Sequence, residues 1–175
     1  MIKKNTLFRL KNKLIAKLIT RLPRLAKKLI ASYSAFETED IPWTPIVKPL
    51  SKCKIAIVTT CGLHHREEKP FNMSDKLGDP SYRTIDTQRP LSSLTITHDY
   101  YDHSDAEKDI NIVFPIERLK ELQKTGKIGE VSNTHYAFMG HIDGLYINIL
   151  INETAKEVAR KLKADNVDIA LLTPA

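Results

Sequence analysis

The stretch KIAIVTT at residues 54–60 decides the fold class of this 175-residue chain. It is a short, continuous apolar run rich in β-branched side chains, and Cys61 and Gly62 follow it directly. A run of this kind, without polar alternation, is typical of a strand buried on both faces of a parallel sheet. We therefore expect an α/β domain with this strand inside its sheet.

Three further stretches predict strands, namely SLTITH at 93–98, HYAFMG at 135–140 and VDIALLTPA at 167–175. In the last of them, residues 167–172 have the composition of a buried strand that leads into a turn. The stretch between Gly62 and the second strand contains prolines and little periodicity. It predicts a long irregular excursion, and long loops of this kind are often functional.

Two helices are predicted between these strands. Pro115 fits the first position of a helix that extends to Lys124. The second helix covers residues 152–164, with Asn152 or Thr154 as its N-cap. Strands that alternate with helices predict βαβ units, and hence a mainly parallel, Rossmann-like sheet with flanking helices.

The chain divides into three parts by composition. Residues 1–36 hold ten of the 27 lysines and arginines and no acidic residue, so they form a basic arm. Residues 37–52 are a proline-rich linker, and residues 53–175 form the α/β domain. Beyond the arm, 17 basic residues face 21 acidic ones, so the net charge of +6 belongs to the arm and the remainder is mildly acidic.

The arm has the pattern of an amphipathic helix. From Leu7 to Ile30, leucines and isoleucines recur at steps of three and four with cations between them, and Pro23 is predicted to kink the helix. One interpretation is a helix that binds an anionic membrane surface. The other is an arm that packs on its own domain or on a partner subunit. No nucleic-acid recognition module follows, so a nucleic-acid partner is not expected.

Cysteine usage and hydropathy indicate a cytoplasmic protein. Cys53 and Cys61 are the only two cysteines, and they lie at the two sides of a predicted strand, so a disulfide framework is not expected. No apolar run approaches the roughly 18 residues that a membrane-spanning helix needs. We expect a cytoplasmic protein, with peripheral membrane association open through the arm.

The densest polar cluster follows the predicted strand 93–98 directly. Its members are His98, Asp99, Tyr100, Tyr101, Asp102, His103, Asp105 and Asp109. In α/β sheets, groups that contact ligands lie beyond the carboxyl ends of strands. A neutral imidazole can act as an acid or a base, and neighbouring carboxylates orient it. The alternative is a solvated loop whose aspartates cap turns and helices.

From this cluster and from the end of the first strand we predict a set of site residues. The predicted catalytic residues are His98, His103, Asp99 and Asp102, and the predicted substrate-binding residues are Tyr100, Asp109 and Cys61. For Cys61, which ends an apolar run, packing as a small buried side chain is the competing interpretation.

Part of the cluster is similar to the metal-binding element of metallo-β-lactamase-type hydrolases. His98, Asp102 and His103 match its spacing, but Tyr100 stands where the second histidine is required. One zinc ion needs only three protein ligands and a water, so a zinc hydrolase is kept as a remote alternative and no metal site is predicted. The glycines form no nucleotide-binding motif.

Four stretches resemble the B-type selenoprotein subunits of the glycine, sarcosine, betaine and D-proline reductases. They are residues 41–61, 97–122, 135–140 and 167–175. The resemblance covers about residues 42–175 and is most specific over 97–116. There, an extended run, the His/Asp/Tyr cluster, an Asp-Ile-Asn and a Phe-Pro occur in fixed order.

The resemblance has a consequence for the end of the chain. In the proline-reductase member, a strand ending in Leu-Thr and two small residues leads directly into selenocysteine, with a cysteine three residues later. Here Leu172, Thr173, Pro174 and Ala175 occupy the matching place. Because UGA encodes selenocysteine, we hypothesise that the reading frame was ended at such a codon and that the fold is incomplete at its C-terminus. A genuine partial domain is the alternative.

The resemblance implies an oxidoreductase. A thiol or selenol placed after Ala175 would cleave a small amine or amino-acid-like substrate reductively, with other reductase subunits or a thiol or selenol electron donor as partners. No cofactor is expected within residues 1–175, and this stretch alone is expected to be inactive. The competing hypothesis is a non-catalytic binding or scaffold protein that the basic arm recruits to a membrane.

Overall fold

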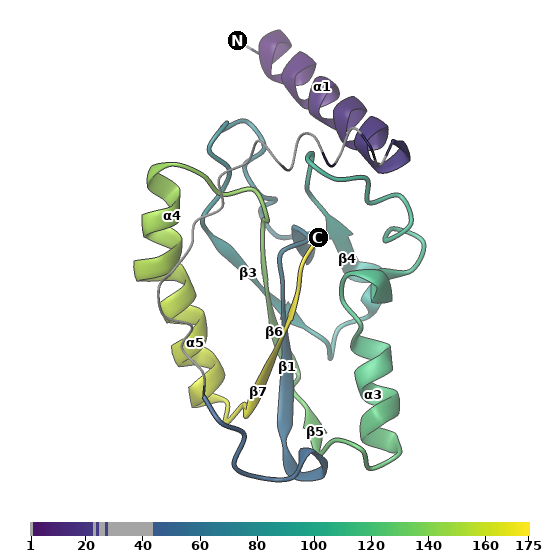
Figure 1. The fold of residues 1–175 in the computed structure, drawn as a ribbon, viewed down its shortest axis with the longest axis vertical. Coiled ribbons are helices and arrows are strands. Elements are labelled where there is room, and N and C mark those ends of the chain that lie inside the picture. Colours follow the sequence, from purple (N-terminus) through teal and green to yellow (C-terminus); the bar gives the residue numbers. More distant parts are fainter. Residues whose placement is uncertain (1, 23, 25–26, 28–43) are drawn as a thin grey trace. The chain divides into compact units, whose positions relative to one another are not determined.

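The computed structural model describes residues 2–22, 24, 27 and 44–175 (Figure 1). It forms two compact units. One comprises Met1–Val47 together with Asp99–Asp102, and the other comprises Lys48–His98 together with His103–Ala175. The first unit contains helix α1 (Ile2–Arg21), and the second contains the sheets.

The basic arm is helical from Ile2 to Arg21, and its amphipathic character stays a prediction. Leu7, Leu10, Leu14 and Leu18 are each at least half exposed, whereas Ala16 is buried. The predicted kink at Pro23 and the linker up to residue 43 lie outside the described residues. The two interpretations of the arm, membrane surface or partner subunit, stay predictions. No described helix is long and apolar enough to cross a bilayer.

The main sheet is mixed and mostly parallel, which confirms the α/β class. Strand β1 (Lys54–Thr59) pairs in parallel with β5 (Glu130–Val131), β6 (Thr134–Phe138) and β7 (Ile169–Thr173), and β3 (Tyr82–Asp86) pairs with β6 in the antiparallel sense. Because β7 pairs with β1 from Ile55 to Thr59, strands β5 and β6 share the other edge of β1, one after the other. The Rossmann-like topology stays a prediction.

Strand β7 differs from its prediction as a buried strand. None of its five residues is buried, and Leu172 is 70% exposed. The reason is its place in the sheet: β1 pairs with it from Ile55 opposite Ile169 to Thr59 opposite Thr173, and no described strand pairs with its other edge.

The strand predicted at residues 93–98 lies in a second, two-stranded sheet and not in the main sheet. Strand β4 (Leu94–Ile96) pairs with β2 (Leu63–His65) in the antiparallel sense, so the prediction that 93–98 joins the parallel sheet was wrong. The chain turns away from β1 at Gly62, whose φ of 76° lies in the left-handed region. The predicted irregular excursion was also wrong in part, because it contains β2 and β3.

Helices cover both faces of the main sheet (Figure 1). They are α3 (Ile116–Lys124), α4 (Leu145–Ile149) and α5 (Ala155–Ala164), and a π-helical turn (Leu150–Thr154) joins the last two. The predicted helix after Pro115 is confirmed, but the second one begins earlier than expected. Thr154 occupies the N-cap position of α5 but makes no capping hydrogen bond, and its hydroxyl donates to the Pro80 carbonyl at 2.9 Å instead. Asn152 lies within the π-helical turn.

Candidate functional site at the carboxyl edge of the parallel strands

Strands β1, β6 and β7 are parallel, so their carboxyl ends meet at one edge of the sheet. This is the edge at which open α/β sheets bind ligands. Backbone hydrogen bonds extend the pairing past the strands: the Thr60 amide donates to the Thr173 carbonyl at 3.1 Å. The Ala175 amide donates to the Thr60 hydroxyl at 3.2 Å. The end of β7 is therefore held beside the end of β1.

Two threonine hydroxyls from neighbouring strands converge on one carbonyl at this edge. Thr59 and Thr173 are register partners, and their Oγ1 atoms donate to the carbonyl of Val113 at 3.0 and 2.9 Å. Val113 lies at the end of the segment that carries the predicted polar cluster. These two hydrogen bonds therefore fix the return of that segment to the sheet.

The turn at Gly62 brings His98 to the same edge. The Gly62 amide donates to the Phe138 carbonyl at 2.9 Å, and its carbonyl accepts from the Thr97 amide at 2.9 Å. A Cβ added to Gly62 would lie 2.5 Å from the Thr97 oxygen and 3.2 Å from Cβ of His98, so only glycine fits. The His98 side chain is buried.

Cys61, at the end of β1, is fully buried and opposes Met139 in an isolated β-bridge. Burial raises the pKa of its thiol to about 11. The thiol therefore stays protonated at neutral pH, and the geometry favours packing over contact with a substrate. Cys53 is likewise buried and free.

His103 is held by two acceptors on its own loop. Its Nε2 lies 3.1 Å from the carbonyl oxygen of His98, and its Nδ1 lies 2.8 Å from a carboxylate oxygen of Glu107. The predicted pair of histidines is thus linked, through the main chain of His98 and the side chain of His103.

The predicted aspartates lie in two different units. Asp99 is buried in the first unit, where its carboxylate accepts from Arg9 Nε at 2.6 Å and lies 3.6 Å from Lys13 Nζ. The hydrogen bond to Asp99 raises the pKa of Arg9. Tyr100 and Asp102 belong to the same unit and are half-buried.

Asp109 lies in the second unit and is exposed. Its carboxylate accepts from the amide and the side chain of Asn111 at 3.0 and 2.9 Å, which lowers the pKa of Asp109. Asp109 is thereby the N-cap of a short 3-10 helix, Ile110–Ile112. Asp109 therefore fits the alternative in which the loop aspartates cap turns and helices. Its described contacts give no indication of substrate binding.

Three buried histidines were not singled out as structural residues from the sequence. His64 and His65 are both buried in β2. His64 bonds the Thr97 hydroxyl, and His65 bonds the Ser93 hydroxyl and the Asp86 amide. Burial lowers the pKa of His65. Their partners lie 21 to 33 residues away, so no local pattern could have identified these roles.

His135 closes a gap in the sheet. Its Nδ1 accepts from the amide of Ile57 at 2.8 Å, at the point where β5 ends and β6 begins along the edge of β1. Burial lowers the pKa of His135 to about 4, so the ring is neutral at pH 7. Among the described residues no His, Cys, Asp and Glu side chains form a group that could hold a metal ion.

Comparison with known proteins assigns the class of protein to which this edge belongs. The family model described as glycine/sarcosine/betaine reductase selenoprotein B matches residues 10–175. The chain therefore belongs to this family, and the resemblance inferred from its sequence is confirmed. No solved structure matches the chain.

The chain is 37% identical to D-proline reductase subunit gamma of Acetoanaerobium sticklandii over 131 residues. This match covers 75% of this chain and 52% of that protein. It is 32% identical over 143 residues to glycine reductase complex component B subunit gamma of Symbiobacterium thermophilum, covering 77% and 31%. For betaine reductase complex component B subunit beta of Peptoclostridium acidaminophilum, the identity is 31% over 134 residues, covering 73% and 29%. The chain thus spans between 29% and 52% of the length of these three relatives.

Proposed function

We propose that this chain contributes to a reductase subunit that cleaves a small amine or amino-acid-like substrate reductively. One observation carries the proposal: β1, β6 and β7 end at one edge, where Thr173 is tied to Thr60 and Val113. The relatives, which are longer, are named as subunits of D-proline, glycine and betaine reductases. A thiol or selenol that follows Ala175 would stand at this edge.

In this proposal the deprotonated thiol or selenol is the nucleophile. It attacks the substrate carbon that carries the activated amine, the carbon–nitrogen bond breaks, and the amine leaves with a proton. A second thiol or selenol then attacks the sulfur or selenium, so that the carbon product leaves and takes up a proton and a bond between the two chalcogen atoms remains, which two further electrons reduce. The electrons come from a thiol or selenol donor carried by partner subunits. No cofactor is proposed within residues 1–175.

The residues of the described chain have the supporting roles. His98 and His103 are the proposed acid and base, because proton transfer to the leaving nitrogen needs a group with a pKa near neutrality. Asp99 and Asp102 are proposed to set the charge around them, and Tyr100 to contact the substrate. The buried Cys61 and the capping Asp109 support the fold of the edge instead.

The nucleotide sequence that follows the codon of Ala175 tests the proposed nucleophile. We expect a UGA or cysteine codon there, a cysteine codon three positions later and an open frame beyond. Mass spectrometry of the protein purified from its natural source should then show a polypeptide longer than 175 residues. A different stop codon with no thiol-encoding frame after it would contradict the proposal.

A second proposal concerns α1 alone: that it binds an anionic lipid surface. The observation is that Leu7 and Leu14 are 69% and 60% exposed on a segment whose only charges are positive. The full chain should sediment with vesicles that contain phosphatidylserine, and a version without residues 1–36 should not. Equal sedimentation of the two would contradict this proposal and favour an arm that docks on protein.

A further inference from the structure

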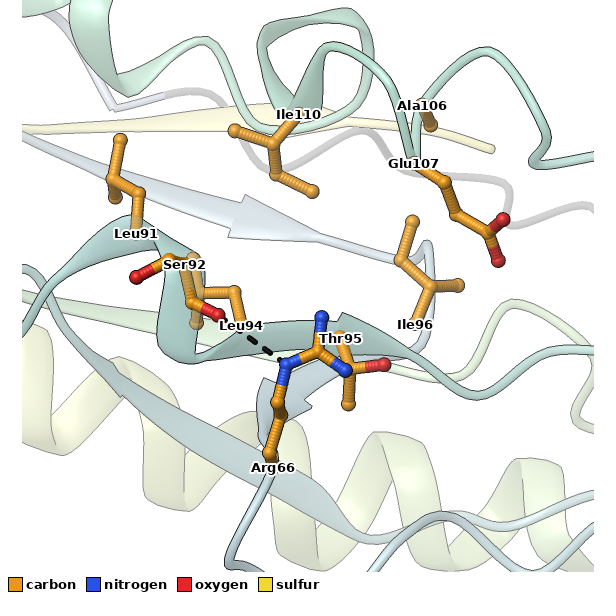
Figure 2. Close-up of a pocket in the computed structure, with 9 residues that line it drawn as sticks. All are labelled: Arg66, Leu91, Ser92, Leu94, Thr95, Ile96, Ala106, Glu107 and Ile110. Atoms are coloured by element: carbon orange, nitrogen blue, oxygen red, sulfur yellow. Dashed lines mark hydrogen bonds between the residues drawn. The ribbon is translucent and has the colours of Figure 1, made fainter.

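The β2–β4 ribbon and the loop after His103 form a pocket that the proposed mechanism does not use (Figure 2). Its volume is about 410 Å³, within the roughly 300 to 1,000 Å³ of small-molecule sites. Its lining includes the aliphatic Leu91, Leu94, Ile96 and Ile110 together with the charged Arg66 and Glu107, and more of its surface is polar than apolar. All of these residues belong to one compact unit.

Arg66 is held in place by one hydrogen bond and keeps two nitrogens for a ligand. It follows β2 directly, and its Nε donates to the Ser92 carbonyl at 3.3 Å. Figure 2 shows the two terminal nitrogens directed into the space beside Leu94 and Thr95. No described residue pairs with these two nitrogens. A guanidinium fixed through Nε presents the remaining pair as a fork that matches a carboxylate.

The carboxylates near Arg66 along the chain and in the pocket are already engaged. Arg89 pairs with Glu67 and, at 4.0 Å, with Glu68. The carboxylate of Glu107 pairs with His103 at 2.8 Å. Arg66 is exposed, and no ion pair among the described residues engages its charge. Leu94, Ile96 and Ile110 line the space in front of it.

We propose that this pocket binds a small monocarboxylate with an aliphatic body. The carboxylate would accept from the two terminal nitrogens of Arg66, and the body would pack against Leu94, Ile96 and Ile110. Glu107, at the margin of the pocket, disfavours ligands with a second negative charge. The inference stands apart from the proposed function, because it involves neither a thiol nor residues beyond 175.

Binding of isobutyrate to the 175-residue chain tests the assignment, with isobutyramide as the uncharged probe of the same shape. The titration is followed by NMR spectroscopy through the methyl resonances of Leu94, Ile96 and Ile110. We expect a dissociation constant on the order of 1 mM for isobutyrate. Isobutyramide should bind at least about tenfold more weakly, because a charge-assisted pair is lost.

Two arginine variants complete the test. Arg66→Gln should weaken isobutyrate binding by about tenfold or more, whereas Arg89→Gln, which removes an arginine already paired with Glu67, should change it less than about twofold. Far-ultraviolet circular dichroism should show that both variants are folded. Equal affinity for isobutyrate and isobutyramide, unchanged binding in Arg66→Gln, or no binding of isobutyrate at 20-fold above the expected constant would overturn the proposal.

Discussion

Strands β1 and β7 are parallel neighbours with opposite surroundings. In β1, Ile55, Ala56 and Ile57 are all buried, because the strand has partners on both edges and helices on both faces. In β7, no residue is buried and Leu172 is 70% exposed. The two strands nevertheless end together, in register from residue 55 to residue 59 of β1.

The difference separates two properties of the sheet. Burial depends on neighbours on every side: β1 has strands on both edges, whereas no described strand pairs with the outer edge of β7. The position of the strand end depends on hydrogen bonds, which fix both strands equally at Thr59, Thr60 and Thr173. Hydrogen bonds therefore fix the carboxyl edge of the sheet, even though β7 has a strand partner on one edge only.

The largest expected effect concerns the chemistry at the shared edge. In the complete subunit with its partner subunits, replacing His98 or His103 with alanine should lower turnover by about 10² to 10⁴-fold if that residue is the acid or base. Cys61→Ala, a buried neighbour at the end of β1, is the matched control and should lower turnover less than about tenfold. Unchanged turnover in both histidine variants would reduce the loop to a structural role.

A pair of alanine substitutions sharpens the contrast between the two strands. Ile57→Ala should lower the free energy of unfolding by about 3 kcal/mol, because it leaves a cavity in a fully buried site. Leu172→Ala on β7 should change it by less than about 0.5 kcal/mol. Urea unfolding followed by circular dichroism measures both. Equal losses would mean that β7 is covered in solution.

His135 accepts a hydrogen bond from the Ile57 amide of β1, and this contact makes the stability of the sheet depend on pH. The folded-state pKa of His135, about 4, lies below its unfolded value of 6.5, so the unfolded state binds more protons between these pH values. The contribution of His135 is complete above pH 6.5 and is lost as the pH falls towards 4.

Urea unfolding should therefore show a stability about 2 kcal/mol lower at pH 5 than at pH 7 from this residue alone. His135→Gln, which keeps an acceptor for the Ile57 amide but does not titrate in this range, should lose most of that dependence. If the variant shows the same decline as the original protein, the contact between His135 and Ile57 is not the cause.

The smallest expected effect concerns the two threonines that share the Val113 carbonyl. Thr59→Val should lower stability by about 1 kcal/mol, because its hydroxyl is fully buried. Thr173→Val should lower it by about half as much, because water reaches the half-buried end of β7. A larger loss for Thr173→Val would reverse the ranking of the two strands. Thermal unfolding of both variants decides between these outcomes.

The sequence predicted the elements that have a strong local pattern. Strand β1 was found because residues 54–60 are apolar without interruption, and α3 because Pro115 precedes a helical period. Strand β3 was missed because Ile85 is its only buried residue and polar side chains surround it. Strand β4 was found but misplaced, because an apolar run does not tell which strand will pair with it.

The candidate site stays a prediction, and the contacts around it could not be predicted from the sequence. A polar cluster after a strand pointed to His98 and His103, and the chain does bring His98 to the carboxyl edge. The contact between His135 and Ile57 joins residues 78 positions apart, and Arg66 was not considered because a single arginine after a strand has no distinctive spacing. Such contacts depend on how distant elements pack, which local composition does not encode.

Alkylation of the native subunit tests the central claim most directly, that the reductase chemistry takes place at the carboxyl edge beyond β7. The reduced protein from its natural source is treated with iodoacetamide, assayed for reductase turnover with its partner subunits and mapped by mass spectrometry. We predict loss of turnover with the label on a thiol or selenol just after Ala175, while Cys53 and Cys61 stay unlabelled because both are buried. Full turnover after complete labelling of such a residue, or the absence of any thiol or selenol there, would contradict the account.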